Sequence, residues 1–214
     1  MISYSSWTGT RTTLDALQAA GWRLLMSPDT LERAKGKAAP RWTDGTPAPY
    51  CLDNGAWGCF TRGVPFDADR FRWALERIGA GADWVVMPDA VGDRAATLEM
   101  SKSWRRELAG YRFVFCVQDG MTPSEVLKAA RGAVGLFVGG STEFKEATMG
   151  TWARLAHENG MICHVGRVNS QRRIRMCHAA GVDSIDGSSV ARFSCTLRRL
   201  DLAVRQPDLF GGKL

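Results

Sequence analysis

Short apolar runs alternate with longer amphipathic segments along most of this 214-residue chain. The amphipathic segments, such as FDADRFRWALERIGAGA and PSEVLKAARGAV, carry apolar residues at helical spacing and run into a glycine, which is typical of helices and their C-terminal caps. The apolar runs are candidate strands, and there are eight of them: 2–4, 23–26, 49–53, 84–89, 113–119, 134–140, 161–166 and 183–187. This alternation predicts parallel β/α units.

Eight strands with intervening helices are the elements of a (β/α)₈ barrel, a fold that begins at about 200 residues. We therefore predict a compact TIM-like α/β barrel over 1–206, with 207–214 as a C-terminal tail. A doubly wound parallel sheet is the alternative. The least regular segment is 27–48, where Pro, Gly and Lys predict a mobile loop rather than a helix.

Composition narrows the class of protein. Hydrophobic residues make up 45% of the chain, enough for a full core, and 28 basic against 22 acidic side chains leave a formal charge of +6. That balance favours an anionic partner, either a nucleic acid or a phosphorylated metabolite. No apolar run approaches the length of a membrane span, and the N-terminus lacks a basic region followed by an apolar one, so we expect a soluble, cytoplasmic protein with no membrane partner.

The six cysteines are widely scattered and form no C-x-x-C pair. We therefore expect reduced, mostly buried thiols and neither a metal site nor a cofactor.

Polar residues close the apolar runs repeatedly, and in a barrel of this kind the chemistry gathers where the strands end. The residues in such places are Asp53, Asp89, Gln118, Asp119, Gly139, Gly140, Arg167 and Asp186. Each has an alternative explanation, because an Asp after a strand often caps the next helix and glycines are common in tight turns. Their shared position at strand ends favours a site.

Enzymes that act at the anomeric carbon of a sugar usually use two or more carboxylates in one cleft. One attacks or stabilises the sugar cation, and another transfers a proton to the leaving group. The pattern therefore makes Asp186 a candidate nucleophile, held at a strand end where a sugar C1′ can reach it.

The order of these motifs resembles that of the tRNA-guanine transglycosylase superfamily, and most closely its shorter DNA-acting branch, the DpdA-type 7-deazaguanine transglycosylases of phages and bacterial DNA-modification clusters. The resemblance runs from YCLDNGAW to GVDSIDGSS. LDNGAWG is similar to the family's D-S-G-G strand end, DWVVMPD to its V-V-M-x-x-D, VQDG to its Q-G-G, FVGG to its I-G-G and GVDSIDG to its G-V-D-M-F-D.

The resemblance implies an exchange of guanine for a 7-deazaguanine precursor such as preQ0 by double displacement. It makes Asp186 the nucleophile, with Asp53 assisting proton transfer, and it assigns recognition of the purine to Asp89, Gln118, Gly139 and Gly140. Trp57, which follows the DNG turn, is a candidate for stacking on the purine. The target nucleotide has to be flipped or already single-stranded.

The chain departs from the tRNA-acting enzymes in one respect. Their C-terminal zinc site uses closely spaced cysteines and a histidine, and no such spacing occurs here. We therefore expect a barrel without the zinc-binding subdomain, and DNA guanine sites and a free 7-deazapurine as partners, together with accessory DNA-modification proteins.

Charge also favours a nucleic acid. Between Arg167 and Arg205 there are eight Arg and three Asp. Arg167, Arg172 and Arg173 lie near the predicted strand end and are the candidate phosphate contacts, with a solvated helix face as the alternative. His164, at another strand end, is more readily explained as a buried structural histidine than as a ligand or proton carrier, since no second His or Cys cluster accompanies it.

Two other functions remain open at this stage. A nucleoside or DNA N-glycosidase would use water in place of the incoming purine and would share Asp186 and Asp53. A nucleic-acid-binding barrel without catalysis would bind DNA regardless of Asp186.

Overall fold

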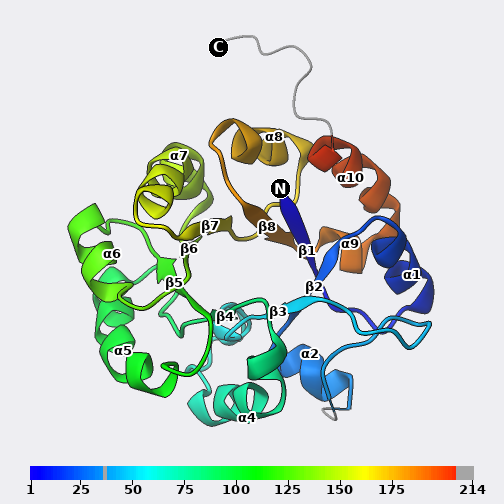
Figure 1. The fold of residues 1–214 in the computed structure, drawn as a ribbon, viewed down its shortest axis with the longest axis horizontal. Coiled ribbons are helices and arrows are strands. Elements are labelled where there is room, and N and C mark those ends of the chain that lie inside the picture. Colours follow the sequence, from blue (N-terminus) through cyan, green and yellow to red (C-terminus); the bar gives the residue numbers. More distant parts are fainter. Residues whose placement is uncertain (36–37, 206–214) are drawn as a thin grey trace.

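The computed structural model describes residues 1–35 and 38–205, and its strands form a closed, all-parallel barrel (Figure 1). The strands follow one another around the barrel in chain order: β1 Ile2–Ser6, β2 Arg23–Met26, β3 Tyr50–Leu52, β4 Val85–Val86, β5 Phe113–Val117, β6 Gly135–Val138, β7 Ile162–Val165 and β8 Ser184–Gly187. Since β1 pairs with both β2 and β8, the sheet has no free edge. The predicted (β/α)₈ barrel is confirmed and the doubly wound sheet is excluded.

Helices surround the barrel (Figure 1). They are α1 Arg11–Ala19, α2 Pro28–Arg33, α3 Ala56–Arg62, α4 Ala68–Ile78, α5 Arg94–Glu107, α6 Pro123–Ala129, α7 Thr142–Glu158, α8 Gln171–Ala179, α9 Ser189–Arg192 and α10 Leu197–Arg205, with 3₁₀ turns at Gly79–Gly81 and Ser194–Thr196. The capping side chains Asp67, Asp93 and Ser170 each accept a hydrogen bond from a backbone N–H in the first helical turn.

Successive side chains of each strand point alternately into the barrel and out toward the helices, so the buried apolar residues form two clusters. One apolar cluster fills the inside of the barrel and includes Tyr4, Leu25, Cys51, Trp84 and Val114. The residues between them, such as Leu24, Leu52, Val85 and Phe113, face outward and join the cluster under the helices. A parallel strand covered on both faces is apolar on both, which explains why the strands read as continuous apolar runs.

The expectation of an irregular loop over 27–48 is wrong at its beginning, where α2 forms. Ser27 and Thr30 make a reciprocal capping box, and Pro28 stands in the first helical turn, where its missing N–H costs nothing. Leu31 is buried against the outer core. Between α2 and β3, the described residues form no helix or strand apart from one antiparallel bridge between Arg41 and Pro47.

Three further expectations concern the cysteines, the C-terminal tail and membrane-spanning helices. Five of the six cysteines are buried and Cys195 is exposed, and all six thiols are free. The predicted tail at 207–214 lies outside the described residues. Within residues 1–35 and 38–205, no helix combines the length and apolarity needed to cross a membrane.

A carboxylate near the beginning of β4 is held by positive charge. Asp83 Oδ2 accepts hydrogen bonds from Arg23 Nη1 at 2.8 Å and from the Tyr4 hydroxyl at 2.9 Å. Arg23 opens β2, so this cluster lies at the end of the barrel where the strands begin. Burial raises the pKa of the Tyr4 phenol, which therefore stays protonated as a donor to Asp83.

Candidate active site

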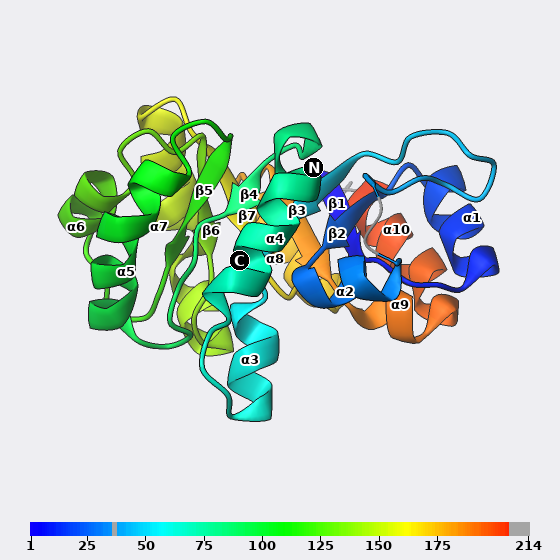
Figure 2. The ribbon, with the colours of Figure 1, turned by 90° about the horizontal axis from the view of Figure 1, so that it is seen from below.

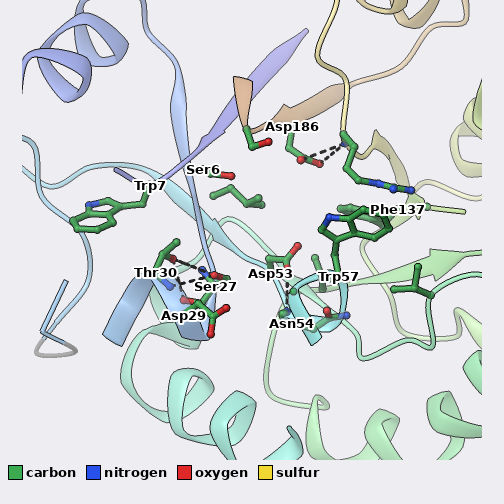
Figure 3. Close-up of a pocket in the computed structure, with 18 of the residues that line it drawn as sticks. Ser6, Trp7, Ser27, Asp29, Thr30, Asp53, Asn54, Trp57, Phe137 and Asp186 are labelled. Atoms are coloured by element: carbon green, nitrogen blue, oxygen red, sulfur yellow. Dashed lines mark hydrogen bonds between the residues drawn. The ribbon is translucent and has the colours of Figure 1, made fainter. Parts of the chain in front are cut away.

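A pocket of about 600 Å³ opens at the opposite end, where the strands finish (Figure 3). Every strand or the loop directly after it contributes to its lining, through Ser6, Ser27, Asp53, Asp89, Gln118, Gly139, Arg167 and Asp186. Figure 2 shows α3 projecting from the barrel, and Trp57 and Gly58 of this helix also line the pocket. The carboxyl ends of barrel strands are where enzymes with this fold place their chemistry.

The pocket brings together eight of the ten site residues predicted from the sequence. These are Asp53, Trp57, Asp89, Gln118, Gly139, Gly140, Arg167 and Asp186. Arg172 and Arg173 do not line it. They lie in the first turn of α8, where both pair with Glu146 of α7, at 2.6 Å and 2.8 Å.

Asp186 is held in place from two sides by hydrogen-bond donors. Its carboxylate is 6% exposed. Oδ1 lies 3.0 Å from His164 Nε2, and the backbone N–H of Arg167 approaches both carboxylate oxygens at 3.3 Å. His164 is fully buried, and its Nδ1 lies 2.9 Å from the Ser184 hydroxyl. These contacts fix the orientation of the carboxylate in the pocket.

Asp53 stands directly after β3 and points into the same pocket (Figure 3). Its Oδ1 accepts the backbone N–H of Gly55 at 2.6 Å, in a turn that needs glycine because φ at residue 55 is +84°. Burial raises the pKa of Asp53 to about 7, and the negative charges of Asp186 and Asp89 act in the same direction. A carboxyl group with this pKa can both give and take a proton near neutral pH.

Asp89 belongs to a network of side-chain amides. Asn54 Nδ2 donates to its Oδ1 and Gln118 Nε2 donates to its Oδ2, both at 2.7 Å. Gln118 Oε1 in turn accepts the backbone N–H of Gly92 at 3.1 Å. Burial raises the pKa of Asp89, and the hydrogen bonds from Asn54 and Gln118 and the positive charge of Arg167 offset part of that rise. One N–H of Gln118 remains available to a ligand.

An arginine and a tryptophan meet over the pocket. The Arg167 guanidinium lies 4.0 Å from the centre of the Trp57 ring, a cation–π contact, and it also donates to the Gly140 carbonyl. Trp57 is 43% exposed. Farther in, Phe137 of β6 lines the pocket and stacks on His164 at 4.8 Å. These planar groups suit a flat ligand.

The glycine pair after β6 leaves no room for side chains. A Cβ at Gly139 would come 3.0 Å from Gln118 Nε2, and one at Gly140, where φ is +72°, would collide with the Asp119 carboxylate. Asp119 itself accepts hydrogen bonds from the N–H and hydroxyl of Ser141, the residue that caps α7.

The capping explanation fails for all three carboxylates, since Thr122 rather than Asp119 caps α6, the helix after Asp119. Asp93 caps α5, the helix after Asp89, and the N-cap residue of α9, the helix after Asp186, is Ser188. Both Asp89 and Asp186 line the pocket.

Several residues of the site were not selected from the sequence. The sequence pattern does not single out Asn54 or Phe137, and it favours a structural role for His164. The structure does bury and satisfy His164, but one of its two partners is Asp186. A usable signal was its position in β7, where alternation points it into the barrel beside the inward-facing residues of β8.

Arg33 and Arg192 also line the pocket as exposed cations. Among residues 1–35 and 38–205, no group of three or more His, Cys, Asp or Glu side chains is arranged to hold a metal ion.

We also compared the chain with known proteins. It matches none of the protein-family models and none of the curated proteins. The site must therefore be interpreted from its own geometry.

Proposed function

We propose that this protein is a transglycosylase that exchanges guanine in DNA for a 7-deazaguanine base through a covalent glycosyl–Asp186 intermediate. The observation that carries the proposal is a pair of carboxyl groups in one pocket with different environments. Asp186 lies beside His164 Nε2 and the backbone N–H of Arg167, whereas burial raises the pKa of Asp53 to about 7. Two carboxyl groups in different environments can divide the roles of nucleophile and acid/base.

In the first displacement, a lone pair of Asp186 attacks C1′ of the target nucleotide. The C1′–N bond breaks, its electron pair goes to the departing purine, and protonated Asp53 supplies the proton that neutralises it. The products are free guanine, an ester between C1′ and Asp186, and an ionised Asp53.

The second displacement reverses these roles. The incoming purine loses its N–H proton to Asp53 and attacks C1′, and the C1′–O bond breaks to restore the Asp186 carboxylate. Esterification of Asp186 removes one of the negative charges that raise the pKa of Asp53. The pKa of Asp53 therefore falls in the intermediate, which favours the Asp53 anion until the incoming purine gives it a proton.

The remaining groups suit recognition of a purine. Asp89, oriented by Asn54 and Gln118, offers a fixed carboxyl edge for ring N–H groups. The backbone at Gly139 and Gly140 allows close approach, and the Trp57 ring with the Arg167 guanidinium over it forms a planar part of the lining. The choice of guanine and a 7-deazaguanine over other purines rests on the resemblance of the motifs.

The size of the pocket bears on the state of the nucleic acid. A volume of about 600 Å³ lies within the range of small-molecule sites and is large enough for one nucleotide. We expect the target nucleotide to leave its stack and enter this pocket before reaction. The net charge of +6 and the pocket cations Arg33 and Arg192 support a polyanionic substrate.

The test is incorporation of radiolabelled guanine, and of a labelled 7-deazaguanine base, into single-stranded DNA, duplex DNA and tRNA. Asp186→Asn is the control. We expect label in DNA only with intact Asp186, together with a DNA–protein adduct that survives denaturation. Label in tRNA alone would reject DNA as the substrate. Guanine release without an acceptor would instead identify an N-glycosidase, and binding without either reaction would identify a non-catalytic barrel.

A further inference from the structure

A buried chain of three polar side chains links the pocket to the interior of the barrel. Ser184 and Asp186 are two residues apart on β8, so both face inward, and His164 on β7 pairs in register with Ser184. The imidazole contacts both, at 2.9 Å and 3.0 Å. Aromatic rings of Tyr4, Trp84 and Phe137 surround it at centroid distances of 5.9, 4.7 and 4.8 Å.

The partners of the imidazole define its hydrogen-bonding pattern. The Asp186 carboxylate accepts, so His164 Nε2 must carry a hydrogen. In the neutral ring Nδ1 is then an acceptor, and the Ser184 hydroxyl donates to it. The Asp186 carboxylate thus selects the tautomer, and the Ser184 hydroxyl orients the ring by donating to Nδ1.

The order of the three residues differs from that of a serine hydrolase. There the serine faces the substrate and the aspartate is buried behind the histidine. Here Asp186 lines the pocket, whereas Ser184 is 2% exposed and does not line it. The reacting group at the end of this chain is therefore the carboxylate.

The two oxygens of Asp186 are unequally engaged. Oδ1 has His164 Nε2 at 3.0 Å and the Arg167 N–H at 3.3 Å, while among the described residues Oδ2 has only the Arg167 N–H at 3.3 Å. Oδ2 is the freer oxygen for attack on C1′. Once Oδ2 is esterified, Oδ1 becomes a carbonyl oxygen that still faces His164.

We propose that His164, oriented by Ser184, is a positioning residue that accelerates breakdown of the glycosyl–Asp186 intermediate. This inference rests on the proposed function. When the C1′–Oδ2 bond breaks, its electron pair returns to the carboxylate, and the negative charge spreads to Oδ1, where the Nε2–H donates. No proton changes place in this contact. Because a carboxylate oxygen accepts more strongly than an ester carbonyl, the hydrogen bond strengthens as the intermediate breaks down.

Two variants of similar volume separate this role from packing. Methionine and glutamine both fill the site, but only glutamine can donate an N–H toward Asp186. We expect His164→Met to slow breakdown of the adduct on addition of purine by about 10- to 100-fold, as befits loss of a hydrogen bond to a charged group. The fraction of enzyme trapped as adduct at steady state should rise. His164→Gln should recover most of the rate.

Ser184→Ala tests the second contact. It removes the hydroxyl that donates to Nδ1 and orients the imidazole toward Asp186, and we expect breakdown to slow by about 3- to 10-fold. The double variant His164→Met/Ser184→Ala should be no slower than His164→Met, because Ser184 acts through the histidine. Melting temperatures of all variants report on folding separately.

The outcomes distinguish the inference from the proposed function. Wild-type protein that exchanges purines while His164→Met breaks down its adduct at the wild-type rate rejects the inference alone. Equal losses in His164→Met and His164→Gln, without accumulation of adduct, show a purely structural histidine. Wild-type protein that neither forms an adduct nor exchanges purines rejects the proposed function, and the inference with it.

Discussion

The two ends of the barrel surround their carboxylates with different partners. Where the strands begin, Asp83 is held by the Arg23 guanidinium and the Tyr4 hydroxyl. Where they finish, Asp53 and Asp89 are hydrogen-bonded to backbone and side-chain amides, and the part of the chain that the structure describes provides neither with an ion pair. The pKa of both Asp53 and Asp89 is raised by burial.

The presence or absence of a cationic partner distinguishes the structural carboxylate, Asp83, from the candidate catalytic and binding carboxylates, Asp53 and Asp89. A charge removed from water is costly unless a cation compensates it, and a fold selected for stability alone would pair it or replace it. Asp83 has such a partner in Arg23. Asp53 and Asp89 have no ion-pair partner among the described residues, so the fold keeps the desolvation cost of these carboxylates, as active sites do where the pKa of a group matters more than its contribution to stability.

The largest expected effect comes from Asp186→Asn. Asparagine preserves the shape of the side chain but is a poor nucleophile, so we expect purine exchange to fall by about 10⁴-fold or more, with no trapped adduct. Exchange assays and denaturing gels measure both. A variant that retained a tenth of the wild-type rate would remove Asp186 from the mechanism.

Asp53→Asn should have the next largest effect. Loss of the acid/base group should reduce exchange by about 10²- to 10⁴-fold. Asp29→Asn is the matched control, since Asp29 also lines the pocket but is bound by Arg62 and Arg70. We expect Asp29→Asn to remain within about threefold of wild type, because it takes part in no proton transfer. Equal losses would show that the assay senses overall pocket charge.

At the opposite end, Asp83→Asn should affect stability rather than exchange. It removes the anionic partner of Arg23 and of the Tyr4 hydroxyl, and we expect unfolding to become easier by about 2 kcal/mol. Chemical denaturation measures this loss, while the exchange rate of the folded protein should stay at the wild-type value. A selective fall in exchange would mean that the two ends are coupled.

The direction in which the free energy of unfolding changes with pH tests whether the pKa of Asp53 is raised in the folded protein. Its pKa is raised from 3.8 to about 7 in the folded protein. Between these values the folded state binds more protons than the unfolded state, so the contribution of Asp53 to stability falls as pH rises. The uncharged Asp53→Asn variant avoids this loss.

We expect Asp53→Asn to match wild type near pH 4 and to be more stable by about 2 kcal/mol at pH 8, after allowance for solvent screening of a half-buried group. Denaturation midpoints at the two pH values give the difference. A variant that is less stable than wild type at pH 8 contradicts the raised pKa.

The smallest effects concern phosphate contacts. Arg172 and Arg173 share Glu146, whereas Arg192 is an exposed cation that lines the pocket. We expect Arg192→Gln to weaken binding to single-stranded DNA by about 3- to 10-fold and Arg172→Gln by about twofold. Fluorescence anisotropy at several salt concentrations tests this ranking. The reverse order would favour α8 as the main nucleic-acid contact.

Much of the architecture is predictable from local pattern. All eight apolar runs are strands of the barrel, and polar residues at their ends meet in one pocket. Parallel strands in chain order force this result, because their carboxyl ends must lie at the same end of the barrel. The helix at 28–33 was missed because the capping pair of Ser27 and Thr30 outweighs the unfavourable composition that follows it.

The sequence by itself determined the strand and helix periods and the set of side chains at the strand ends, whereas closure of the sheet into a barrel, rather than a doubly wound sheet, was shown by the structure. Only the tertiary structure decided what each polar residue does at the strand ends. It turned Asp119 toward a helix cap, placed His164 beside Asp186 through the register of β7 with β8, and engaged Arg172 and Arg173 with Glu146. The physical reason is that burial, hydrogen bonding and charge depend on neighbours distant in the chain, which no local pattern contains.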